Sequence, residues 1–159
     1  HCIKLPPFAQ QSEARRFAGT SQVYYGDESA RPLIIEGTVG DATLRSTMNW
    51  DAIDADAETQ KIMQHWQKLG QFRANHMAVG AGKHQVISEE NGLVFSRVRN
   101  NDQVVIGIDV PKGNKEIEVA TIFKNGTQLH DFYSKQTLEV KDGKVVLNSD
   151  FDMVLLEKK

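Results

Sequence analysis

The spacing of the apolar residues changes once along the chain, and this change limits what the chain can fold into. Before Gly80 and Gly82, apolar residues recur every three or four positions, at Ile62, Met63, Trp66, Leu69 and Phe72. After these glycines, apolar and polar residues alternate. The first spacing is typical of an amphipathic helix and the second of half-buried strands. We therefore predict an α+β chain with a domain boundary between residues 1–80 and 81–159.

Residues 1–80 contain two predicted elements. A β-branched and aromatic run at about 21–26 predicts a buried strand that ends at a glycine. The apolar stripe predicts a helix at about 56–75, which the carboxylate of Asp54 or Asp56 can cap. The loop between them is long, and loops of that length in compact domains are usually functional or disordered. Residues 1–19 show neither period, and we expect them to be irregular.

Residues 81–159 contain about eight short segments in which apolar and polar residues alternate. Turn residues separate these segments, and Asn125-Gly126 and Asp142-Gly143 are hairpin signatures. So many short, half-apolar strands predict an antiparallel Greek-key β-sandwich with a single core. Asn125 also begins a glycosylation sequon, but the turn alone explains an Asn-Gly pair between two strands.

Composition excludes several classes of function. The chain has 159 residues, of which 19 are basic and 21 acidic, and no block of like charge occurs. We therefore expect neither nucleic-acid binding nor a polybasic membrane surface. No apolar run approaches the roughly 18 residues of a membrane span. The single cysteine, Cys2, cannot form an internal disulfide, and the histidines lack the spacing of metal ligands. We predict no cofactor in this chain.

The polar loop after residue 26 holds the best candidates for chemistry. Asp27, Glu28 and Arg31 follow the end of the predicted strand, where loops of α/β barrels carry active sites. Carboxylates there can hydrogen-bond sugar hydroxyls, bind a metal or act as acid and base. Equally, they can pair with Arg31 or Arg45 and simply fix the loop. Trp50 can stack on a sugar ring or pack in a core.

Three stretches carry a resemblance. They are Val23-Tyr24-Tyr25-Gly26-Asp27-Glu28, Leu44-Arg45-Ser46-Thr47-Met48-Asn49-Trp50 and Leu69-Gly70-Gln71-Phe72-Arg73-Ala74-Asn75-His76. In this order and spacing they resemble the α-amylase family, glycoside hydrolase family 13. The resemblance covers residues 21–159 and is to the C-terminal end of the family: the last strand and helix of the (β/α)-barrel, followed by the β-sandwich called domain C. Residues 1–20 depart from the family pattern.

The resemblance implies a retaining hydrolase of α-glucans such as starch and maltooligosaccharides. The family's catalytic aspartates and glutamate lie on earlier barrel strands, so we expect no catalytic residue in this chain. Asp27, Glu28 and Arg31 match the loop after the last strand, and Arg45 and Trp50 match a motif near the substrate cleft. We expect these five residues to support the cleft. Calcium is expected only in the intact parent, and the family implies a secreted or periplasmic location.

Two other functions remain open at this point. The sandwich could be a non-catalytic carbohydrate-binding module, for which Phe123, Phe132 and Tyr133 are candidate aromatic contacts. Alternatively, it could stabilise the protein or form a dimer. A lone barrel strand has two unpaired edges, so we also expect that residues 1–50 are mobile, pack on the sandwich or pair with a second copy of the chain. Because the chain begins at His1, we expect a processed, truncated or excised product.

Overall fold

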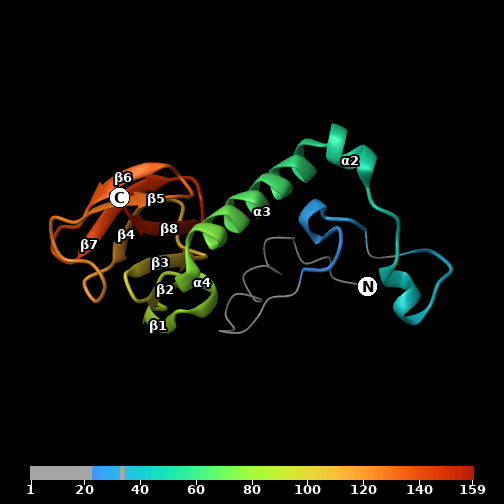
Figure 1. Cartoon of the computed structure of the whole chain (residues 1–159). Coiled ribbons are helices and arrows are strands. Elements are labelled where there is room, and N and C mark those ends of the chain that lie inside the picture. The colour runs from blue at the N-terminus through green and yellow to red at the C-terminus, as the bar shows by residue number, and fades with distance from the viewer. Residues whose placement is uncertain (1–22, 33–34) are drawn as a thin grey trace. The chain divides into compact units, whose positions relative to one another are not determined.

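Figure 1 shows the computed structural model of the chain, in which residues 23–32 and 35–159 are described. The chain divides into two compact units, His1–Gly70 and Gln71–Lys159. The division falls within helix α3 (Ala57–Asn75), which begins in the first unit and ends in the second. None of the described helices combines the length and the apolar composition that crossing a bilayer requires.

The described part of the first unit is made of short helices and the start of α3. The short helices are the 3-10 helices η1 (Asp27–Ser29) and η2 (Gly40–Leu44) and the α-helix α2 (Trp50–Ala55). Asp56 caps α3, because its Oδ2 atom accepts a hydrogen bond of 2.7 Å from the Thr59 N–H. This hydrogen bond, and then one from the Thr59 hydroxyl, lower the pKa of Asp56.

The strand predicted at about 21–26 is wrong over its described part, residues 23–26, which form no strand and lead into a turn at residues 25 and 26. The Asp27 N–H donates to the Tyr24 carbonyl at 3.1 Å, and Gly26 has a φ of 85°, which no strand has. A strand needs neighbours for its backbone hydrogen bonds, and the described residues of the first unit include no other strand. Residues 21 and 22, and the irregular segment expected at 1–19, lie outside the described residues.

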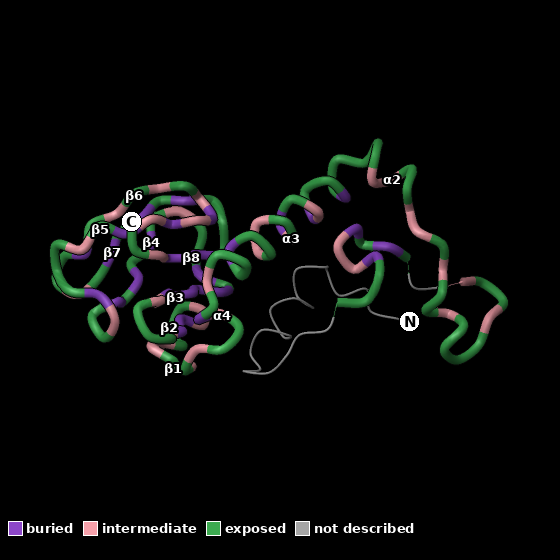
Figure 2. Tube along the Cα trace, viewed as in Figure 1, coloured by how far each residue is buried: buried purple, intermediate pink, exposed green. Residues whose placement is uncertain are grey.

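One face of α3 is buried, as the purple and pink stretches along it in Figure 2 show. Ile62 and Phe72 are buried, so the apolar spacing marks this face. Trp66, which the stripe places in a core, is half-buried. Two polar residues, Thr59 and His65, are also buried there. An apolar pattern cannot reveal such positions.

The second unit is an antiparallel β-sandwich preceded by α4 (Met77–Ala81). Its larger sheet has six strands in the order β1-β2-β3-β8-β5-β6, and its smaller sheet pairs β4 with β7. After β3 the chain crosses to the smaller sheet for β4, returns to the larger sheet for β5 and β6, crosses again for β7 and returns with β8 between β3 and β5. Connections that cross between the sheets in this way are of the Greek-key kind. The Greek-key sandwich predicted from the sequence is thus confirmed. The strands are β1 (Lys83–Ser88), β2 (Leu93–Arg99), β3 (Asp102–Ile108), β4 (Gly113–Glu118), β5 (Gln128–Asp131), β6 (Gln136–Glu139), β7 (Lys144–Ser149) and β8 (Met153–Lys158).

The two sheets share one apolar core. In β7 the side chains alternate, so that Val145 and Leu147 are buried while Val146 between them is 63% exposed. In contrast, β3 and β8 are buried at most positions, because they lie in the middle of the larger sheet. Helix α4 packs against β2 and β3. The core comprises Val94, Val105, Val110, Ile117, Val119, Phe123, Leu129, Val140, Val145, Leu147, Val154 and Leu156.

Candidate functional site

Arg31 organises the predicted site loop of the first unit. Its side chain is buried, with Nε donating to the Tyr25 carbonyl at 3.0 Å and Nη1 and Nη2 donating to the carbonyls of Ser46 and Leu44 at 3.0 and 3.1 Å. The guanidinium also lies over the Tyr25 ring, 4.0 Å from its centroid. Arg31 therefore joins the loop to the segment around residue 45, which the sequence places in a separate motif.

Gly26 leaves the space that Arg31 occupies. A Cβ atom added at Gly26 would lie 2.5 Å from the Arg31 Nε atom. The φ of 85° at this position is also unfavourable for residues other than glycine. The glycine of the Tyr-Tyr-Gly-Asp stretch is therefore required twice, by the backbone conformation and by the close approach of the guanidinium.

Asp27 and Glu28 accept hydrogen bonds from the backbone of their own turn. The Tyr24 N–H donates to Asp27 Oδ2 at 2.9 Å, and the Gly26 N–H donates to Glu28 Oε2 at 3.1 Å. Neither carboxylate forms an ion pair with an arginine in the described part of the chain. The two carboxylates thus hold the loop through hydrogen bonds from backbone N–H groups. The carboxylate–arginine ion pairs considered from the sequence do not form in the described part of the chain.

The other two predicted site residues lie on the surface. Arg45 is exposed next to the carbonyls that Arg31 binds, and Trp50 is 65% exposed at the start of α2. Trp50 is therefore not part of a core. The pair Ser29 and Asn49 links the same two segments, since the Ser29 hydroxyl donates to Asn49 Oδ1 at 2.7 Å and Asn49 Nδ2 donates to the Ser29 carbonyl at 2.8 Å.

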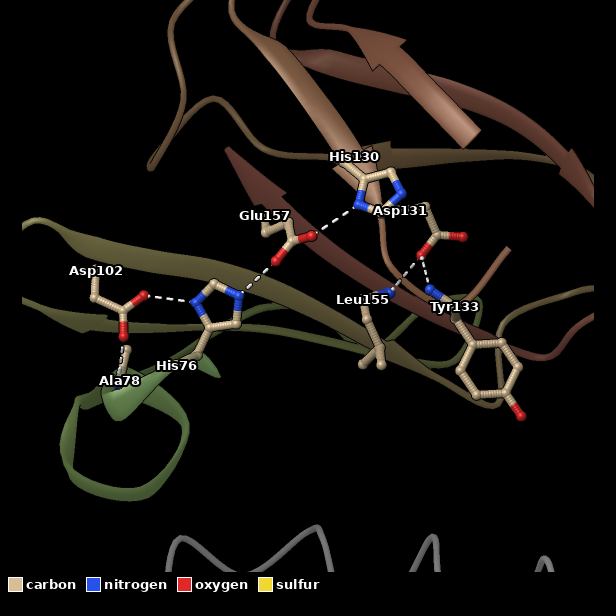
Figure 3. Close-up of polar contacts among 8 residues, drawn as sticks. All are labelled: His76, Ala78, Asp102, His130, Asp131, Tyr133, Leu155 and Glu157. Carbon is tan, nitrogen blue, oxygen red and sulfur yellow. Dashed lines mark hydrogen bonds and ion pairs between the residues drawn. The ribbon is translucent and has the colours of Figure 1, made fainter. Parts of the chain in front are cut away.

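A second polar cluster, in the sandwich unit, has no counterpart in the sequence analysis. Figure 3 shows its four side chains in a row: Asp102, His76, Glu157 and His130. His76 Nδ1 lies 2.7 Å from Asp102 Oδ1, and its Nε2 lies 2.6 Å from Glu157 Oε2. The other oxygen of Glu157 lies 2.7 Å from His130 Nδ1. We call these residues the Asp102–His130 row.

The row attaches the end of the helical region to the sheet. His76 follows α3 directly, whereas Asp102, Glu157 and His130 lie on β3, β8 and β5. Asp102 Oδ2 also accepts the Ala78 N–H at 2.7 Å, which holds the first turn of α4. Burial tends to raise the pKa of Asp102, but the hydrogen bonds from the Ala78 N–H and from His76 outweigh it and lower this pKa.

Both ring nitrogens of His76 face carboxylate oxygens. A carboxylate can only accept, so each short contact needs a proton between the two atoms. The His76 ring therefore lies between two carboxylates and links them. Sequence reasoning could not find this arrangement, because the partners of His76 lie 26 and 81 residues further along the chain.

Two further buried charges in the sandwich are structural. Asp131 is fully buried and accepts the N–H groups of Leu155, Tyr133 and Ser134 at 2.8, 3.3 and 3.1 Å. Lys115 donates to the carbonyls of Ser149 and Phe151, and burial lowers the pKa of its ammonium. Within residues 23–32 and 35–159, no three His, Cys, Asp or Glu side chains gather as metal ligands do.

The chain is similar in sequence to an α-amylase and in fold to several solved structures. No protein-family model matches the chain. The chain is 40% identical over 88 residues, or 55% of its length, to the periplasmic α-amylase of Escherichia coli (strain K12), of which it covers 13%. The α-amylase of Anoxybacillus shares its fold with a TM-score of 0.60 and 23% identity, over 86% of this chain and 28% of that one. AmyP in complex with maltose does so with a TM-score of 0.68 and 17% identity, over 94% of this chain and 33% of AmyP.

The chain thus spans about an eighth of its curated relative and about a third of the solved structures. At these identities the structural likeness shows the fold, and the sequence match is a similarity to part of an α-amylase. In sequence the chain is similar to part of a periplasmic α-amylase, and in fold it is similar to part of solved α-amylase structures.

Proposed function

We propose that the chain is the C-terminal portion of an enzyme that hydrolyses α-glucans such as starch and maltooligosaccharides. The 40% identity over 88 residues with a periplasmic α-amylase carries this proposal. Because the chain spans 13% of that relative, the catalytic aspartates and glutamate lie, on this proposal, on barrel strands outside the chain. Calcium is proposed only for the intact parent. The named location of the relative supports a periplasmic or secreted protein.

In this portion, the role proposed for the loop around Arg31 is support of the substrate cleft. Arg31 and Gly26 hold the loop rigidly, so that Asp27 and Glu28 are positioned by the turn and do not act as acid or base. The aromatic rings of Tyr24, Tyr25 and Trp50 are 39%, 43% and 65% exposed. Exposed rings can stack on the apolar face of a sugar, whereas buried ones cannot.

The role proposed for the sandwich is to stabilise the end of the barrel. The Asp102–His130 row connects the residue that follows α3 with three strands of the larger sheet. A binding module would instead need aromatic residues exposed on a sheet face. Of the three candidates, Phe123 and Tyr133 are buried and Phe132 is half-buried, which favours the stabilising role over carbohydrate binding.

A chimeric enzyme tests the proposal. This chain would replace the aligned segment of the periplasmic α-amylase of E. coli, and starch hydrolysis would be measured alongside thermal unfolding. We expect a folded chimera that releases reducing sugar from starch. A chimera that unfolds cooperatively near the melting temperature of the parent but releases no sugar would refute the proposal.

The 159-residue chain alone distinguishes the alternatives. We expect it to release no sugar from starch, and hydrolysis by a preparation free of other amylases would show that the catalytic groups are present after all. Calorimetric titration with maltoheptaose addresses the binding-module alternative, for which heat of binding to the isolated chain would be needed. Sedimentation velocity addresses the dimer, since a monomer at all concentrations tested would exclude self-association through the exposed barrel portion or the sandwich.

A further inference from the structure

The sandwich unit contains two Asn-Gly pairs, and both lie in turns between strands. Asn91-Gly92 connects β1 with β2, and Asn125-Gly126 lies between β4 and β5. In such a pair the backbone nitrogen of the glycine can attack the side-chain amide of the asparagine, because glycine has no Cβ atom to hinder the approach. Both asparagines are exposed to solvent, so exposure alone does not distinguish them.

The fold restrains the reacting atoms at Asn125. Its Oδ1 atom accepts the Gly143 N–H at 2.8 Å, which holds the side-chain amide away from its own backbone. The attacking atom would be the nitrogen of Gly126, and its N–H donates to the Val140 carbonyl at 2.8 Å. Both hydrogen bonds must open before the nitrogen can reach the amide carbon.

Neither restraint exists at Asn91. Within the described part of the chain, the Asn91 side chain and the Gly92 N–H make no hydrogen bond of ordinary length and angle. Neither the nucleophile nor the electrophile is held by a hydrogen bond, and the Asn91 side chain is exposed to water although Gly92 is half-buried.

We propose that Asn91 is a site of spontaneous deamidation and that Asn125 is protected by the fold. The Gly92 nitrogen loses its proton and forms a bond to Asn91 Cγ, while the bond from Cγ to Nδ2 breaks and ammonia leaves. Water then opens the resulting succinimide at either carbonyl, giving aspartate or isoaspartate at residue 91. The net change is the gain of one water and the loss of one ammonia, without oxidation or reduction.

The product alters the β1–β2 turn in two ways. It adds a carboxylate next to Glu89 and Glu90, which are already exposed. Isoaspartate also lengthens the backbone immediately before Gly92, which fits closely: a Cβ atom there would lie 2.6 Å from the Asp109 carbonyl oxygen, and the φ is 92°. We therefore expect isoaspartate to displace this turn from the residues that follow β3.

Peptide mapping of the full chain after incubation at mildly alkaline pH tests the proposal. Trypsin separates the two sites into peptides 84–97 and 125–135, so one digest reports both rates by the mass change from amide to acid. We expect conversion in peptide 84–97 to be roughly tenfold faster or more, because two hydrogen bonds must open at Asn125. An isoaspartyl methyltransferase should label peptide 84–97, and N91Q should abolish the labelling.

The same incubation in guanidinium provides the control. Unfolding removes the restraints on Asn125, so the two rates should become similar if the fold causes the difference. Equal rates in the folded chain, faster conversion at Asn125, or no conversion at Asn91 in the folded chain would each overturn the proposal. A rate ratio that persists unchanged in guanidinium would also overturn it, since local sequence would then be the cause.

Discussion

Glu157 is the centre of the Asp102–His130 row, and its replacement by glutamine is the sharpest test of what the row contributes. Glutamine has the same shape but only one acceptor oxygen, and its amide nitrogen can only donate. Glu157→Gln therefore keeps an acceptor for only one histidine and removes the negative charge from both contacts, at 2.6 Å to His76 and 2.7 Å to His130. The Glu157 side chain is 18% exposed, so water replaces the lost partner poorly.

A hydrogen bond to a charged group contributes about 1.5–3 kcal/mol to the free energy of unfolding. We expect Glu157→Gln to lower that free energy by about 2 kcal/mol, because both contacts lose their charged partner where the side chains are largely buried. Glu139→Gln is the matched control. Glu139 forms an ion pair with Lys141 at 3.7 Å, and both side chains are well exposed. We expect the control to cost at most about 1 kcal/mol.

Urea unfolding followed by circular dichroism measures both variants against the parent chain. A double-mutant cycle with His130→Ala isolates the contact, and we expect a coupling energy of about 1 kcal/mol between the two positions. If Glu157→Gln costs no more than Glu139→Gln, or if the cycle shows additive effects, the row does not stabilise the sandwich and the reasoning is wrong.

Two further predictions concern Gly26 and Asp102. Gly26→Ala should speed amide exchange at residues 24–31, because the new Cβ meets Arg31. The control Gly37→Ala has a similar φ of 79° but open space around it, so equal effects on exchange in the two variants would contradict the close-approach argument. Asp102→Asn should destabilise the chain at neutral pH. Because folding lowers the pKa of Asp102, this carboxylate stabilises the fold above its unfolded pKa of about 3.9 and loses that effect as the pH falls through the lower folded value. The difference in stability between Asp102→Asn and the parent should therefore shrink in acid, and a difference independent of pH would be inconsistent with this account.

The sandwich could be predicted from the sequence because its pattern is local. Each strand of a two-layer fold has one face in the core, so alternation such as that of Val145 and Leu147 around Val146 records the burial directly. The turn pairs Asn125-Gly126 and Asp142-Gly143 then mark where the chain reverses. The helix could be predicted for the same reason, because its apolar spacing and its capping residue are close together in sequence. Asp56, the residue before α3, is that cap.

The turn at residues 25 and 26 could not be predicted in this way. An aromatic and β-branched run has the same local signature whether or not neighbouring strands are present, and neighbours decide whether it pairs. One alternative from the sequence paired Asp27 or Glu28 with Arg31 or Arg45. Instead, Arg31 binds carbonyls at residues 25, 44 and 46.

The Asp102–His130 row depends on strand order, which no local pattern contains. His130 and Glu157 are polar residues on strands, and an alternating pattern predicts that such residues face solvent. Only the neighbouring positions of β3, β8 and β5 bring their side chains together. Whether the five predicted site residues support a substrate cleft stays a prediction.

The position of β8 has a consequence for how the sandwich can assemble. In the larger sheet, β8 is the single link between β1-β2-β3 on one side and β5-β6 on the other. It is also the last of the eight strands in chain order, so a ribosome releases it after all the others. Until it emerges, the larger sheet exists as two separate pieces, each with an open edge that β8 will later cover. The larger sheet can therefore be completed only when β8 is available. The pairs that β8 forms join residues far apart in sequence, and such pairs form slowly.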